Sequence, residues 1–177
     1  MALVCPGGNF IMDGILIRNN FSKDEETEII AGAVAATGRE HDLARRAHKD
    51  FECYIRRKEM FCLFSGKELA GFVIKKNIGA DTDEIQGLYI KPAFRGRKLS
   101  DILMNAVAGE KGIKYLAATY SGLMGKKLVM LGFEEIPFES LSLGTKVGFW
   151  KSRLRFGRIA GIIKSRCKNK KVKFFLK

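Results

Sequence analysis

Residues 87–103 read GLYIKPAFRGRKLSDIL, and this stretch decides the fold. The apolar run that ends at Ile90 predicts a strand, and Pro92, which cannot donate to a sheet ladder, predicts its end. After a basic turn containing Gly96, apolar residues from Leu99 onward recur at helical spacing. A strand, a basic turn and a helix in this order favour anion binding, because a helix N-terminus has unpaired N–H groups and roughly half a positive charge.

The flanking sequence predicts an α/β domain, more closely described as α+β with a mixed sheet and helices packed on its faces. Alternating or apolar runs rich in aromatic and β-branched residues predict strands, and apolar residues at helical spacing predict helices. The predicted strands are 15–18, 60–64, 69–74, 84–90, 115–120, 133–138 and 147–154. The predicted helices are 24–36, 40–58, a helix from 99 that Gly112 can end, and 122–131.

The stretch resembles the acetyl-CoA signature of the GNAT superfamily of N-acyltransferases, V-x-P-x-x-R-G-x-G-x-G/A between a strand and a helix. Ile90, Pro92, Arg95 and Gly96 match it. ILIRN resembles the family's first strand, FCLFSGKELAGFVI its second and third, and LVMLGFEEI its second motif. The resemblance covers about residues 14–154. It implies a GNAT N-acetyltransferase domain over 14–156, after an N-terminal segment 1–13 and before a basic amphipathic C-terminal extension 157–177.

By this resemblance the protein is an acyltransferase with acetyl-CoA as cosubstrate and a primary amine as acceptor. The amine would attack the thioester directly. The pantetheine would lie beside the strand, and a backbone N–H of Tyr89 or Ile90 would face the thioester oxygen. The residues implied to bind the cofactor are Leu88, Tyr89, Ile90, Arg95, Gly96, Arg97, Lys98, Leu99 and Ser100.

The phosphate turn departs from the family pattern at two positions. Lys98 stands where glycine is usual, and Ser100 stands where glycine or alanine is commoner. Serine is small enough to be harmless. Because lysine carries a Cβ, we expect Lys98 to have a helical backbone rather than a positive φ, with its ammonium supplementing the pyrophosphate site. Weakened cofactor binding is the alternative.

Glu84 is the candidate general base. It lies eleven residues before Arg95, which is the spacing of the catalytic glutamate in the family's histone-acetylating members. Taking the proton from a lysine-like amine costs roughly 4–5 kcal/mol at pH 7, so a base is useful. The alternative is an exposed strand-end carboxylate next to Asp81 and Asp83.

The sequence evidence for a general acid is weaker than that for the general base. Many family members have a tyrosine four residues before the glycine of the Gly-Phe pair, but here that position is Leu128. Tyr120 or Ser121, at the end of the preceding strand, could protonate the leaving thiolate instead. Tyr120 is equally well explained as a core residue with its hydroxyl at the edge.

The charge is concentrated at one end of the chain. The net charge is +13, and residues 140–177 contain 12 Lys and Arg and no acidic residue, which leaves 20 basic and 19 acidic residues before them. Between 150 and 177 these cations alternate with aromatic and aliphatic residues. This segment could pack on the domain, lie on an anionic membrane surface or contact RNA. Separately from this segment, a homodimer also stays open.

The remaining features favour a reduced, cytoplasmic protein. The four cysteines have no CxxC spacing, His41 and His48 lack metal-ligand spacing, and the N-terminal residues lack a secretory pattern, so we expect free thiols, no metal and no export. No stretch approaches the roughly 20 apolar residues of a membrane span. Three functions stay open: an N-acetyltransferase, an acyl-CoA-binding protein without turnover, and an acetyltransferase directed to RNA or an anionic membrane by its tail.

Overall fold

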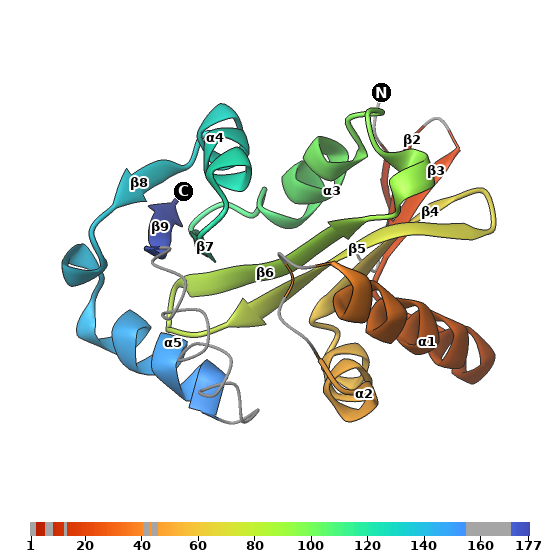
Figure 1. Ribbon diagram of the computed structural model, residues 1–177, viewed down its shortest axis with the longest axis horizontal. Helices are drawn as coiled ribbons and strands as arrows, with labels where there is room; N and C mark the ends of the chain where they lie inside the picture. The colour runs from red at the N-terminus through yellow and green to blue at the C-terminus, as the bar shows by residue number, and fades with distance from the viewer. Residues whose placement is uncertain (1–2, 6–8, 13, 41–42, 44–45, 155–170) are drawn as a thin grey trace. The chain divides into compact units, whose positions relative to one another are not determined.

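The computed structural model describes all residues except 1–2, 6–8, 13, 41–42, 44–45 and 155–170 (Figure 1). The chain divides into two compact units. Unit 1 holds residues 1–75 and 87–109, and unit 2 holds residues 76–86 and 110–177. Strands β5 (Glu68–Asn77) and β6 (Thr82–Ile90) each contribute residues to both units. Both units combine strands with helices, which confirms the predicted α/β class.

Unit 1 contains strands in the order β1-β2-β3-β4-β5-β6. The predicted hairpin is present: β4 and β5 pair antiparallel on either side of Gly66, whose φ of 61° is left-handed. β4 is buried from its first residue to its fifth, which explains its nearly continuous apolar sequence. The sequence did not predict the first two strands. The bounds are β1 Leu3–Cys5, β2 Asn9–Met12, β3 Ile15–Arg18 and β4 Met60–Ser65.

Unit 1 also holds helices α1 (Lys23–Arg39), α2 (His48–Arg56) and α3 (Leu99–Val107). Figure 1 shows α1 and α2 on one side of the strands and α3 on the other. Because α2 covers only His48–Arg56, the helix predicted for 40–58 is too long. Ala47 has an extended backbone, and its N–H donates to the Asp50 carboxylate at 2.9 Å, which fixes the start of α2 at the following residue.

In unit 2 the strand order is β6-β7-β9-β8. β6 pairs parallel with β7 (Lys114–Thr119), from Thr82 opposite Lys114 to Ile85 opposite Ala117. β9 (Lys173–Leu176) lies antiparallel between β7 and β8 (Glu134–Ile136). Phe175 of β9 is buried, so the last residues of the basic segment belong to the core of this unit.

Residues 147–154 form part of a helix, so the strand predicted there is wrong. Helix α5 runs over Leu143–Leu154, after helix α4 (Gly122–Met130) and the 3-10 turn η2 (Phe138–Ser140). Its first turn is capped by the Ser142 hydroxyl, which accepts from the Thr145 N–H at 3.2 Å. The valine and aromatic residues that suggested a strand are divided between two helix faces. None of the described helices is long and apolar enough to span a bilayer.

Candidate functional site

The turn after β6 joins this strand to α3 through two residues with a positive φ. The 3-10 turn η1 (Pro92–Phe94) is followed by Gly96 with φ 83° and Lys98 with φ 57° and ψ 13°. The expectation of a helical backbone at Lys98 is therefore wrong: this residue is left-handed and is the N-cap of α3. A left-handed conformation costs a non-glycine residue about 1–2 kcal/mol. Lys98 adopts this costly conformation because the turn has to lead directly into α3.

The first turn of α3 presents its main-chain donors without a side-chain cap. The first intrahelical bonds run from the N–H groups of Asp101 and Ile102 to the Lys98 carbonyl, at 2.9 and 3.2 Å. The N–H groups of Leu99 and Ser100 lie ahead of these bonds, where a helix has no internal acceptor for them. Together with the helix dipole, these groups can hold a phosphate.

The cations of the loop are not equivalent. The Arg95 Nε donates to the Ile90 carbonyl at 3.0 Å, and its Nη2 forms an ion pair with Glu40. The Arg97 guanidinium lies over the Phe94 ring, 5.5 Å from its centroid. Arg95 therefore braces the loop against β6 and shares its charge with a carboxylate, while Arg97 is positioned by an aromatic ring.

The C-terminal part of β6 has one edge bonded to β5. The Lys91 N–H donates to the Ala70 carbonyl at 2.8 Å, and the Tyr89 carbonyl points the same way, since a Cβ on Gly71 would meet it at 2.5 Å. Main-chain groups of successive residues in a strand point to opposite edges, so the N–H groups of Leu88 and Ile90 face away from β5. An extended ligand could add there as a further strand.

Two observations within the described residues concern this second edge of β6. The parallel register of β6 with β7 ends at Ile85. Gly87 then has a φ of 65°, a conformation that interrupts a regular strand. The strand is therefore irregular at Gly87.

Arg46 is a residue that sequence reasoning missed. It is a buried cation of unit 1, and its Nη1 lies 2.9 Å from where a Cβ on Gly87 would stand. Its guanidinium also lies over the Tyr54 ring at 6.0 Å. Gly87, which has no Cβ, therefore leaves space for the Arg46 guanidinium. No local sequence pattern predicts this contact.

In unit 2, Glu84 is almost completely buried, with 1% of its side chain exposed. The Arg153 Nη2 donates to Oε1 at 2.6 Å, and the Ser152 hydroxyl lies 3.2 Å from Oε2. The Arg153 guanidinium in turn stacks on the Phe149 ring, 3.3 Å from its centroid. The alternative of an exposed strand-end carboxylate is therefore wrong. Glu84 is a buried carboxylate whose two oxygens are both engaged by α5.

The candidate acids lie at the end of β7. Ser121 is the N-cap of α4: its hydroxyl accepts from the Met124 N–H at 3.4 Å. Tyr120, the residue before it, is half-buried. Leu128 is buried in the core and has no group to donate. Tyr120 and Ser121 therefore stay predictions for the proton donor.

Among the described residues, no group of histidines, cysteines and carboxylates could hold a metal ion. His48 is exposed and lies 3.2 Å from Glu52 one helical turn away, which is a surface pair. Cys53 and Cys62 are free thiols, and burial raises the pKa of Cys62 above its ordinary range. His41, Cys5 and Cys167 lie where side chains are not described.

Comparison with known proteins identifies a family over more than half of the chain. The sequence profile of the acetyltransferase (GNAT) family matches residues 20–121. This range includes the turn after β6 and all of β7. A search of the curated proteins found no match to the chain.

Several solved structures share the fold. N-acetylglutamate synthase from Neisseria gonorrhoeae, solved with coenzyme A and N-acetyl-glutamate, superposes with a TM-score of 0.67 at 18% identity, covering 94% of this chain and 35% of that one. Rv2747 from Mycobacterium tuberculosis, solved with CoA and NLQ, gives 0.67 at 10% identity, covering 90% and 96%. Arabidopsis thaliana Naa50, solved with a CoA bisubstrate analogue, gives 0.59 at 11% identity, covering 93% and 98%.

At such low sequence identities, the structural similarity shows that the fold is shared and nothing further. The chain spans about a third of the length of the synthase. It spans nearly the whole length of Rv2747 and Naa50.

Proposed function

The chain belongs to the acetyltransferase (GNAT) family, and on that premise we propose that it transfers an acetyl group from acetyl-CoA to a primary amine. The amine attacks the thioester carbon, the C–S bond breaks, and coenzyme A leaves as its thiol. The observation that carries the proposal is the uncapped first turn of α3 behind the left-handed Lys98. Its main-chain donors suit the diphosphate of coenzyme A.

The diphosphate is bound by the backbone from Arg95 to Ser100. Gly96 and Lys98 turn the chain so that the N–H groups of Leu99 and Ser100 lead α3. The cations of the turn add attraction without geometric specificity. Structures of Rv2747 and the synthase, which share the fold and were solved with coenzyme A, support this assignment.

The pantetheine adds along Leu88, Tyr89 and Ile90, on the edge of β6 that faces away from β5. Of the two donors the sequence suggested for the thioester oxygen, strand alternation favours the Ile90 N–H over that of Tyr89, because the Tyr89 carbonyl and the Lys91 N–H both point to β5. A main-chain donor placed there stabilises the negative charge that develops on the oxygen.

Glu84 accepts the proton of the acceptor ammonium, directly or through a water molecule. It lies on the same strand as the thioester donors and is buried. Arg153 and Ser152 hold both its oxygens in place. Tyr120 or Ser121 protonates the departing thiolate, a step worth only about 2 kcal/mol at pH 7.

The test is thiol release from acetyl-CoA over a panel of amines, polyamines, amino sugars and peptides, with wild type and Glu84→Gln. We expect Glu84→Gln to lower kcat by about 10²–10⁴-fold, the usual contribution of a general base. Calorimetry should show acetyl-CoA binding unchanged. Glu135→Gln, at an exposed carboxylate paired with Lys173, is the control and should leave kcat unchanged.

A second candidate is an acyl-CoA-binding protein without turnover. It is favoured by the engagement of both Glu84 oxygens by α5 and by Leu128, which is buried where the family commonly has a tyrosine donor. The same assay separates the two. Acetyl-CoA binding with no thiol release from any amine would support this candidate and contradict acetyl transfer.

A further inference from the structure

Helix α5 exposes a row of large apolar side chains. Leu143, Val147 and Trp150 follow one another at helical spacing, and 78%, 56% and 45% of their surface is exposed. A helix in a water-soluble domain normally turns such residues inward. The three side chains form one stripe, which we call the α5 stripe.

The opposite face of α5 is already fixed in unit 2. Phe149 belongs to a core cluster with Leu116 and Ile78. Gly148 touches the main chain, since a Cβ on it would lie 1.7 Å from the Ile78 carbonyl oxygen. The helix therefore cannot rotate to bury the α5 stripe without losing this packing.

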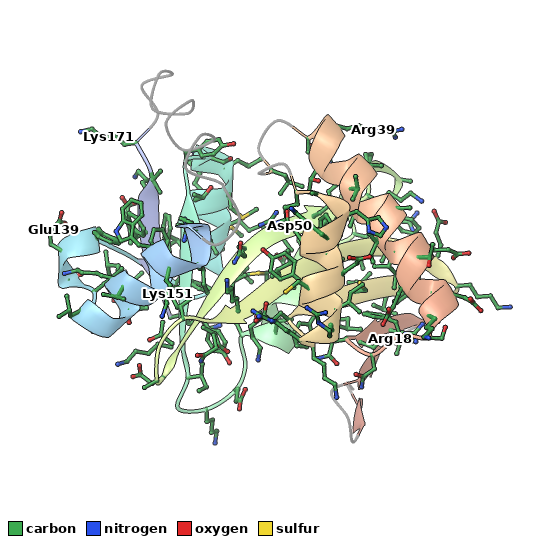
Figure 2. All side chains as sticks on the ribbon, turned by 90° about the horizontal axis from the view of Figure 1, so that it is seen from below. Arg18, Arg39, Asp50, Glu139, Lys151 and Lys171 are labelled. Carbon is green, nitrogen blue, oxygen red and sulfur yellow. The ribbon has the colours of Figure 1, made fainter. Side chains whose placement is uncertain are left out.

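The charged residues on α5 itself are all cationic. Lys146 and Lys151 lie on α5, and Glu139, just before the helix, is the last acidic residue of the chain. Figure 2 labels Lys151 on α5 and Glu139 before it. A partner of this surface must be anionic and must offer an apolar layer.

We propose that the α5 stripe binds the surface of an anionic lipid bilayer. Aliphatic side chains and a tryptophan suit the boundary between headgroups and acyl chains, where an amphipathic helix inserts its apolar face. Lys151 beside them can reach the anionic headgroups, and Lys146, whose Nζ donates to the Glu139 carbonyl at 2.6 Å, adds positive charge. RNA fits less well, because leucine and valine neither stack on bases nor bind phosphates.

Helix α4 provides a matched control within the same unit. Leu123 and Met130 are 82% and 87% exposed, so they are at least as accessible as the α5 stripe. Helix α4 also carries two lysines, Lys126 and Lys127. The strand after it begins with Glu134 and Glu135, of which Glu135 pairs with Lys173, whereas no acidic residue follows α5 in the sequence. Apolar exposure alone would make the two helices equal, whereas the proposal assigns binding to α5.

The test is flotation of the full chain with vesicles of phosphatidylcholine alone or mixed with phosphatidylglycerol. No acetyl-CoA is present, so the result is independent of acetyl transfer. We expect binding to the mixed vesicles, weakened by salt, and little binding to neutral ones. Leu143→Asn with Val147→Asn should lower the partition coefficient by about tenfold or more.

Leu123→Asn with Met130→Asn should leave partitioning within about twofold of wild type, which is well under 1 kcal/mol. Circular dichroism and thermal melts check that both double variants are folded. The proposal is overturned if the α4 variant loses as much binding as the α5 variant, or if neutral vesicles bind equally well. It is also overturned if the chain binds RNA in a salt-dependent manner and does not float with either vesicle.

Discussion

The two halves of strand β6 are built on different chemistry. The C-terminal half, in unit 1, leads into a loop whose usable groups are backbone N–H donors set by Gly96 and Lys98. The N-terminal half, in unit 2, carries Glu84, whose environment comes from side chains of α5 nearly 70 residues later in the chain. Local sequence specifies main-chain geometry, whereas a buried carboxylate depends on which distant element packs against it.

The largest expected effect comes from Gly148→Ala, which unseats α5 from beside Glu84. The new Cβ would lie 1.7 Å from the Ile78 carbonyl oxygen, so the backbone must move. We expect the free energy of unfolding to fall by about 3 kcal/mol or more, at the upper end of overpacking costs. Urea denaturation measures it.

Gly144→Ala is the control, because it lies in the same helix with nothing within 4 Å of the new Cβ. Alanine should stabilise the helix there by up to about 1 kcal/mol. Equal effects of the two substitutions would show that α5 does not pack closely on Ile78.

Arg153→Met tests whether Glu84 depends on its partner. The substitution leaves a carboxylate with 1% exposure without its guanidinium, so we expect a loss of about 2–3 kcal/mol, somewhat below that for a fully buried pair. Combining it with Glu84→Gln should recover part of the loss, because the unpaired charge is then gone. Strictly additive losses in urea denaturation would mean that the two side chains are not coupled.

Lys98→Gly tests whether the left-handed backbone at Lys98 costs stability. Glycine removes the cost of a left-handed lysine, so the free energy of unfolding should rise by about 1 kcal/mol. Lys98→Ala keeps a Cβ at the same φ and should not be stabilising, although it loses the same charge. If the free energy of unfolding rises equally in both variants, relief of backbone strain is not the cause of the increase. Calorimetry with acetyl-CoA on both variants measures what the ammonium adds to binding.

The smallest effect is expected at Glu25→Gln, which contrasts an exposed ion pair with the buried one at Glu84. The hydrogen bond from Arg18, with the Ser22 N–H, lowers the pKa of Glu25 from 4.5 to about 2. Because the folded-state value is the lower one, the stabilisation is present above about pH 4.5 and is lost as pH falls toward 2.

At pH 7 the loss on substitution should be below about 1 kcal/mol, since Glu25 is 40% exposed and solvent screens the pair. Glutamine preserves the capping box with Ser22, so the charge alone is tested. Thermal melts from pH 7 to pH 2 should show the difference between variant and wild type vanish. A difference that persists at pH 2 would point to lost packing instead.

Most elements of the chain could be predicted because their signals are local. Turn residues and apolar spacing predict the strand at Ile15–Arg18, the hairpin around Gly66 and helix α4, which ends just before Gly132. Helix α5 was predicted wrongly from Val147 onward. Its valine and aromatic residues favour a strand by propensity, and only packing of its Phe149 face decides for a helix.

The sequence alone indicated the family, through the resemblance of residues 87–103 to the GNAT signature. It also predicted where a diphosphate would bind, because a glycine-containing basic turn between a strand and a helix implies main-chain donors. It also determined that positive charge gathers after Glu139. Only the tertiary structure decided that Lys98 is left-handed, that Arg153 and Ser152 enclose Glu84, and that the last strand enters the sheet beside β7. The physical reason is range: backbone geometry is set by neighbouring residues, whereas burial and ion pairing are set by residues that meet only in the folded chain.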